Sequence, residues 1–182
     1  MLSKSSLCQA PWFLVLVGSL LATPCLAQEK YPYSHASPPQ ASRYLRDHSI
    51  DVDDVSGHKV RVVEIQRTYT QDHPVIMGTK VMETWFRGFT DYIGGTGPGY
   101  GYETWMMEDG NKIFVESKFL STSEATASGS RRGASHGTAR FAGGTGKFSS
   151  IQGAFTSTVE FDSDPKSGYN RPASRGEYWF AK

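Results

Sequence analysis

The sequence contains very little cysteine. Its only two cysteines, Cys8 and Cys25, both lie near the start of the 182-residue chain. We expect that segment to be removed, as argued below, and the remaining chain then has no thiol. Disulfides, thiolate catalysis and cysteine-ligated metals are therefore excluded for the mature protein.

An excess of either charge is also missing. The chain has 19 Lys and Arg against 18 Asp and Glu, and no basic stripe of the kind that binds phosphate backbones. We therefore expect no nucleic-acid partner. The five histidines are scattered, without the spacing of a metal site, so we predict that they are exposed and that no metal is bound.

Long apolar runs are confined to the first residues. Lys4 precedes the run "WFLVLVGSLLA" at residues 12–22, and "TPCLAQ" follows it, which is the order of a secretory signal. The run is too short to span a bilayer comfortably. We predict a signal peptide over residues 1–27, cleavage after Ala27, a secreted or periplasmic protein, and no stable membrane insertion after signal removal.

No stretch repeats apolar residues with helical spacing, and short strands are predicted instead. Residues 28–58 begin with a proline-rich stretch that has little aliphatic content, so we expect an extended surface segment, with weak alternation near Ile50 that suits a first or edge strand. After Gly57 come seven segments rich in β-branched and aromatic residues, and Asp109-Gly110 predicts a two-residue hairpin turn between two of them. The prediction is an all-β, single-domain, eight-stranded antiparallel β-barrel.

The stretch "RFAGGTGKFSSIQG", residues 140–153, resembles a phosphate-binding loop at first sight. A Walker loop needs glycine where Phe141 stands and Ser or Thr where Phe148 stands, so this reading fails. A glycine-rich reversal between two strands remains, with both phenylalanines as apolar anchors. We assign a structural turn role to four glycines: Gly143, Gly144, Gly146 and Gly153.

The same stretch carries a resemblance to a known family. "GGTGKF" followed by "QGAF", with "EDGNKIFVES" before and "GEYWFA" after, is similar to the allene oxide cyclase and dirigent superfamily over residues 59–182. The resemblance implies a barrel whose lumen holds one small apolar or amphipathic molecule. Members steer a ring closure or orient a radical coupling, and neither role needs a cofactor. No catalytic residue can be transferred by position, and association into homo-oligomers stays open.

Alternation within the strands gives two sets of candidate site residues. Glu83 and Trp85 share one face of a strand, and Glu177 and Trp179 share one face of another, so each face either lines the lumen or points to solvent. Glu83 and Glu177 are the catalytic candidates, because a carboxylate desolvated in a lumen suits acid or base chemistry. Ligand contacts are assigned to five aromatic residues, for which packing is the alternative: Trp85, Trp179, Tyr102, Trp105 and Tyr69.

Three function classes follow from this reading. The first is an exported barrel that acts as a cofactor-free cyclase or isomerase on a small apolar or amphipathic molecule. The second is a non-catalytic carrier or dirigent-like auxiliary that only orients its ligand. The third is a structural barrel whose interior is fully packed with side chains.

Overall fold

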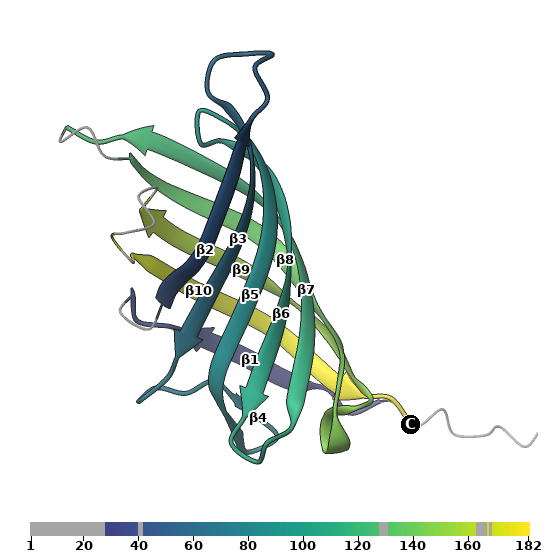
Figure 1. The fold of residues 1–182 in the computed structure, drawn as a ribbon. Helices are drawn as coiled ribbons and strands as arrows, with labels where there is room; N and C mark the ends of the chain where they lie inside the picture. The colour runs from purple at the N-terminus through teal and green to yellow at the C-terminus, as the bar shows by residue number, and fades with distance from the viewer. Residues whose placement is uncertain (1–27, 40–41, 128–130, 163–166, 168) are drawn as a thin grey trace, which may run out of the picture.

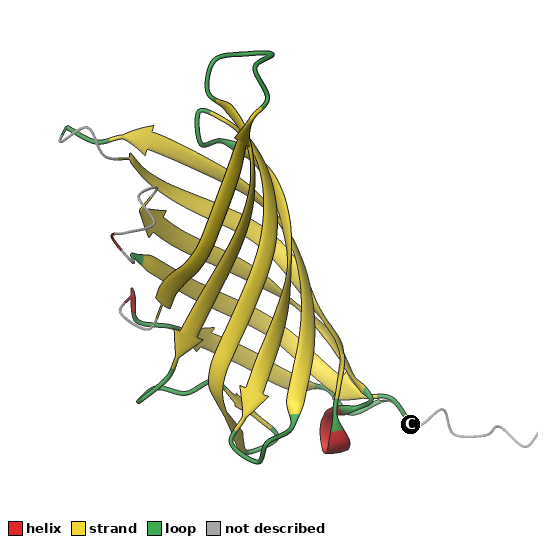
Figure 2. Ribbon diagram, in the orientation of Figure 1, coloured by secondary structure: helices red, strands yellow, loops and turns green. Residues whose placement is uncertain are grey.

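The computed structural model describes residues 28–39, 42–127, 131–162, 167 and 169–182. The predicted signal peptide therefore lies outside the described residues. Nearly all of the described chain is strand, with one short 3₁₀ helix, η2, near one end of the sheet (Figure 2). The elements are β1 (Tyr31–Ala36), β2 (Ser42–Asp51), β3 (His58–Thr68), β4 (Val75–Ile76), β5 (Thr79–Ile93), β6 (Gly97–Met107), β7 (Lys112–Ala125), β8 (Arg131–Gly144), η2 (Gly146–Phe148), β9 (Ile151–Asp162) and β10 (Asn170–Phe180). None of the described helices is long and apolar enough to cross a membrane.

The strands form one antiparallel sheet in the order β1-β10-β9-β8-β7-β6-β5-β3-β2, and β4 pairs with β5 beside this path. The prediction of an all-β fold is confirmed. The prediction of an eight-stranded closed barrel is wrong, because the sheet has ten strands and its two end strands, β1 and β2, are not paired with each other. The sheet nevertheless curls strongly, so that β2, β3 and β5 pass in front of β9, β10 and β1 (Figure 1).

Residues 28–58 contain two strands, of which β2 is the edge strand expected near Ile50, whereas β1 replaces the expected surface path of the first residues. β1 pairs with β10 over six residues, and β2 pairs with β3. The start of this segment also contributes to the core, since Tyr33 is buried there. The sequence lacks aliphatic residues at this point, but the inward positions of β1 are aromatic, and aromatic side chains bury large apolar areas.

The predicted hairpin between β6 and β7 is present, but its loop is longer than two residues. The backbone N–H of Met107 donates to the carbonyl of Asn111, so four residues, 108–111, form the connection. Gly110 has a φ of +81°, whereas Asp109 is not among the residues with positive φ. The Asp109 side chain instead accepts from the N–H of Asn111, which is a typical Asx turn.

The glycine-rich stretch joins β8 to β9 through η2. Phe148 is fully buried and Phe141 is 3% exposed, so both apolar anchors lie inside. Gly143 and Gly146 have φ of +104° and +52°, and a Cβ on Gly144 would lie 2.4 Å from the Lys112 carbonyl oxygen. The Lys147 ammonium, which a phosphate loop would offer to a ligand, is bound by the Asp109 carboxylate at 2.9 Å.

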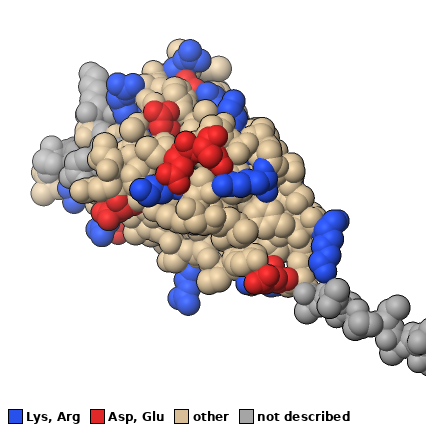
Figure 3. All heavy atoms as spheres, turned by 90° about the horizontal axis from the view of Figure 1, so that it is seen from below, with Lys and Arg blue, Asp and Glu red and all other residues tan. Residues whose placement is uncertain are grey.

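The outside of the sheet carries charged side chains of both signs. On the face seen from below, several acidic residues lie together near the middle and basic residues lie around them (Figure 3). Pairs such as Glu116 with Arg140 on neighbouring strands contribute to this pattern. Exposed pairs of this kind add little stability, so the fold depends on what the curled sheet encloses.

Candidate functional site

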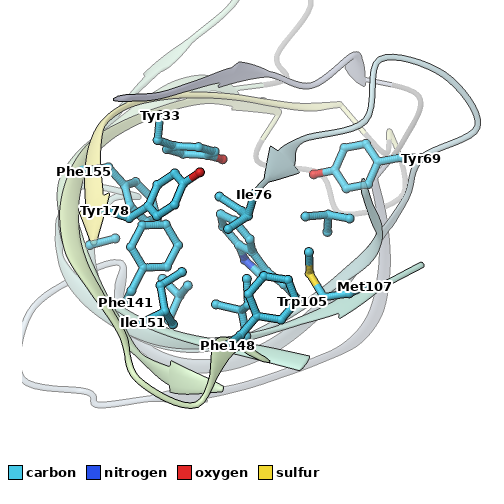
Figure 4. Close-up of a cluster of buried hydrophobic side chains, with 14 residues drawn as sticks. Tyr33, Tyr69, Ile76, Trp105, Met107, Phe141, Phe148, Ile151, Phe155 and Tyr178 are labelled. Atoms are coloured by element: carbon cyan, nitrogen blue, oxygen red, sulfur yellow. The ribbon is translucent and has the colours of Figure 1, made fainter. Parts of the chain in front are cut away.

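The interior of the curled sheet is filled at one end and hollow at the other. The filled end is an apolar cluster in which side chains from strands on opposite sides of the sheet meet (Figure 4). Its members are Tyr33, Tyr69, Ile76, Val81, Trp105, Met107, Ile113, Val115, Ala139, Phe141, Phe148, Ile151, Phe155 and Tyr178. A fully packed interior, the third predicted class, is therefore realised only in this half.

The hollow half is a cavity of about 130 Å³. Small inward residues on β8, β9 and β10 form one wall of it. Along β8, the inward side chain at the packed end is Phe141, whereas Gly137 and Ser135 line the cavity. Ser157 of β9 and Ser174 of β10 continue this small polar wall.

Three aromatic rings form the floor of the cavity, where it meets the packed cluster. Tyr33, Trp105 and Phe155 belong both to the cluster and to the cavity lining. Their ring centroids lie 5.3 to 6.0 Å apart, within the range of favourable aromatic pairs. The floor therefore offers a ready apolar contact for a ligand.

Polar atoms without partners gather in the same cavity. Four buried side-chain atoms of the described residues have no hydrogen-bond partner: Nε2 of His35, Nε of Arg67, Oγ1 of Thr84 and Oγ1 of Thr90. All four residues line the cavity. Arg67, Thr84 and Thr90 are themselves at most 6% exposed. Since buried polar groups are almost always hydrogen-bonded to protein or to water, this concentration leaves unused hydrogen-bonding capacity at the cavity.

The cavity also contains a carboxylate that the sequence analysis missed. Oε2 of Glu103 accepts a 2.7 Å hydrogen bond from the indole N–H of Trp105, and both residues line the cavity. The signal was present in "GYETWMM", where Gly101, Glu103 and Trp105 share one face of β6 by alternation. Glu103 is the acidic side chain that the geometry places beside the aromatic floor.

Burial shifts the pKa of four lining side chains, three tyrosines and one histidine, in the direction that favours the neutral form. It raises the pKa of the Tyr33 phenol well above 10.0 and also raises the pKa of Tyr44 and Tyr92. The pKa of His35 is lowered from 6.5, mainly because burial disfavours its charged form. At neutral pH, these four side chains therefore interact as neutral hydrogen-bonding groups.

The two catalytic candidates from the sequence lie outside the cavity lining. Glu83 accepts a 3.0 Å hydrogen bond from the Trp85 indole. The residues that alternate with them, Thr84 and Phe86, line the cavity, so Glu83 and Trp85 lie on the outer face of β5. A bulge in β5 between Val81 and Glu83 sets this register. Of the two orientations open for the face that carries Glu83 and Trp85, the structure has the one that points to solvent, and the alternate residues of β5 face the cavity.

The same correction applies to β10. Tyr178 points into the packed cluster, so its neighbours Glu177 and Trp179 point outward. There the Glu177 carboxylate pairs with Lys30, and the indole N–H of Trp179 donates to Gln152. The cavity contacts predicted for both residues are not made.

The other predicted ligand contacts divide into two groups. Tyr102 is 41% exposed and stacks on Phe114 on the outer face. Trp105 and Tyr69 are buried and line the cavity while also packing in the cluster. Three histidines also depart from the predicted exposure. His35 lines the cavity, His58 contacts two aspartates, and Nδ1 of the partly buried His73 lies 3.0 Å from the Val81 carbonyl oxygen. The described residues contain no group of acidic, His or Cys side chains suited to a metal ion.

Comparisons of the chain with protein-family models, with curated proteins and with solved structures found no match. The functional argument therefore depends on the cavity itself.

Proposed function

We propose that the protein binds a small amphipathic molecule in the cavity and acts as its carrier. The observation that supports this most directly is the gathering of all four unpartnered buried polar atoms in one cavity with an aromatic floor. Sites for small molecules combine an apolar surface with a few converging polar groups, which is the composition found here.

The size of the cavity limits the ligand. At about 130 Å³ it is close to the ~150 Å³ of an apolar cavity that holds one benzene ring. A single ring with a short polar substituent therefore fits, and the floor of Tyr33, Trp105 and Phe155 provides the surface on which the ring packs.

A cofactor-free isomerase or cyclase is the second candidate. It is supported by the position of Glu103, whose carboxylate lies in the same cavity as the neutral Tyr33 hydroxyl and contributes to keeping that phenol protonated. A base and a proton donor facing one ligand are the minimum for a proton shift. Because Glu83 and Glu177 lie on the outer face, Glu103 replaces them as the proposed catalytic carboxylate.

Two further proposals rest on the sequence alone. We propose export to a secreted or periplasmic location through residues 1–27, and kinship with the allene oxide cyclase and dirigent superfamily through the glycine-rich stretch. The strongly curled antiparallel sheet is compatible with that kinship, although its strand number and open seam differ from the predicted closed barrel.

The binding proposal is tested by titrating the protein with benzyl alcohol while following tryptophan fluorescence. We expect saturable quenching that Trp105→Phe removes, because Trp105 forms part of the cavity floor. Trp85→Phe and Trp179→Phe are the matched controls and should keep the quenching, because both indoles lie on the outer face. Absence of saturable binding in the parent protein would refute the proposal.

Carrier and isomerase are separated by Glu103→Gln. Native mass spectrometry of the protein purified from its own host identifies a co-purifying molecule, which is then incubated with the parent protein and the variant. A carrier returns the molecule unchanged in both cases. An isomerase converts it, and the variant should retain binding while turnover falls by about 100-fold or more, as expected for loss of a general base.

A further inference from the structure

We infer that the ligand is a monocarboxylate whose carboxylate binds Arg67 and Thr84 while its apolar ring packs on Trp105. This inference rests on the proposed binding function and specifies the class of molecule. It starts from the register of three neighbouring strands. Arg67 of β3 is directly opposite Thr84 of β5, and Thr84 is directly opposite Trp105 of β6.

These three residues form one inward row. All three line the cavity, and each is at most 6% exposed. Side chains directly opposite on neighbouring strands have their Cβ atoms about 5 Å apart. The row therefore places a cation, a hydroxyl and an indole in sequence over two strand spacings, about 10 Å. A ring that carries one carboxylate has its polar and apolar parts in the same order and over a similar length.

The positive charge of Arg67 has no negatively charged partner among the described residues. Its Nη2 donates a 2.8 Å hydrogen bond to Oδ1 of Asn170, and its Nε has no partner. No acidic side chain among the described residues forms an ion pair with it. The amide of Asn170 is neutral, so it satisfies one donor and leaves the charge uncompensated. A guanidinium buried without a counter-charge is costly, and a carboxylate that joins it removes that cost.

The other arginine that lines the cavity provides a contrast. Arg61 donates to both carboxylate oxygens of Asp47, at 3.1 and 2.6 Å. Its charge is therefore compensated within the protein, and its planar donors are occupied by the bidentate contact typical of Arg and Asp. Arg67 occupies an equivalent inward position on the same strand but lacks such a partner. The third cation of the lining, Lys118, is exposed to solvent, so Arg67 is the buried cation that a ligand can neutralise.

The Thr84 hydroxyl and the Glu103 carboxylate indicate which kind of carboxylate the cavity favours. Thr84 Oγ1 is unpartnered and lies beside Arg67, so it can donate to a second carboxylate oxygen. Glu103, near the far end of the row, holds the indole N–H of Trp105 through Oε2. Its negative charge opposes a second anionic group at that end, which favours monocarboxylates over dicarboxylates.

The inference is tested with benzoate and its neutral isostere benzamide, measured by calorimetry on the parent protein at neutral pH. Charge-assisted contacts to a buried guanidinium add enough binding free energy that we expect benzoate to bind at least about tenfold more tightly than benzamide. Arg67→Gln should remove this preference. Arg140→Gln, which removes the same charge from the outer face, should keep it.

A second variant tests the inference even if Arg67→Gln does not fold. Asn170→Asp changes one atom type and supplies Arg67 with an internal carboxylate, so it should also remove the preference for benzoate while benzamide binding persists. Equal binding of benzoate and benzamide by the parent protein would overturn the inference and leave the binding proposal standing. If neither benzoate, benzamide nor benzyl alcohol binds, both proposals fail.

Discussion

Nη2 of Arg67 donates a 2.8 Å hydrogen bond to Oδ1 of Asn170, 103 residues further along the chain. The bond joins β3 to β10, which are not neighbours in the sheet order. Ser42 of β2 adds a second link, since its hydroxyl donates to the backbone carbonyl of Asn170 at 3.1 Å. Asn170 is only 3% exposed. Side-chain contacts at this one residue therefore connect the two ends of a sheet whose edge strands do not pair.

Asn170→Ala should lower the free energy of unfolding by about 2 kcal/mol, because it removes the side-chain hydrogen bond that the buried Arg67 guanidinium makes to Asn170. Urea denaturation measures the loss. Ser42→Ala removes one weaker hydrogen bond and should cost about 1 kcal/mol. An Asn170→Ala variant as stable as the parent protein would show that the seam does not need this link.

His58 should make stability depend on pH. Its two ring nitrogens contact the carboxylates of Asp91 and Asp54, and these hydrogen bonds, that to Asp91 first, raise the pKa of His58 above 6.5. A raised pKa in the folded state means that the stabilisation is complete below about pH 6.5 and is lost as the pH rises through the raised value. The hydrogen bond from His58 also lowers the pKa of Asp54, so its share is lost at the acid end, as the pH falls through that lowered value.

The melting temperature of the parent protein should therefore fall relative to that of His58→Gln as the pH rises from about 6 to about 9. His136→Gln, at an exposed histidine, should follow the parent protein across the same range. If the melting temperatures of the parent protein and His58→Gln change with pH in the same way, His58 does not contribute to the pH dependence of stability.

Gly153→Ala should be strongly destabilising. Gly153 has a φ of +140°, and an added Cβ would lie 2.3 Å from the Glu177 carbonyl oxygen and 2.6 Å from the Tyr178 Cα. Both are backbone atoms of the paired strand β10, so they cannot move aside cheaply, and we expect a loss of more than about 2 kcal/mol. Gly110→Ala is the control, because its φ is also positive, at +81°, but nothing lies within 4 Å of the added carbon. It should cost only about 1 kcal/mol in a chemical denaturation experiment.

Phe148→Ala should lower the free energy of unfolding by about 3 to 5 kcal/mol, the usual range for removal of a buried aromatic ring. Phe148 is completely buried within the packed cluster. Phe114→Ala, at a partly exposed ring on the outer face, should cost clearly less. Similar losses for the two variants, measured by chemical denaturation, would contradict the assignment of Phe148 to the core.

Most strand segments of this protein could be predicted from sequence, whereas the pairing of strands that are far apart in the chain could not. The strand segments after Gly57 follow from alternation and β-branched or aromatic content, which are local properties. The pairing of β1 with β10 depends on residues nearly 150 positions apart, such as Tyr31 with Tyr178, and no local pattern reports such a contact. For this reason β1 was expected to be surface chain.

The candidate site shows the same limit at the level of single residues. Alternation separates Glu83 from Thr84 and Glu177 from Tyr178, but it does not say which of each pair faces the interior. Small inward residues beside large ones, as in Gly137 and Phe141 of β8, are readable in the sequence, but they indicate a cavity only once the facing strand is known. Glu103 and Trp105 alternate in the sequence in the same way as Glu83 and Trp85, so alternation alone does not distinguish the carboxylate that faces the interior.

The sheet order has a consequence for the timing of folding. From β2 to β10, apart from β4, every strand pairs with the next one along the chain, so this meander can assemble progressively as synthesis proceeds. β1 is the exception, because its partner is the last strand. Of the described strands, β1 leaves the ribosome first and pairs last, after β10 has emerged. Tyr33 cannot complete the aromatic floor of the cavity before then, so a nascent or C-terminally shortened chain would lack a competent binding site even with most of its strands in place.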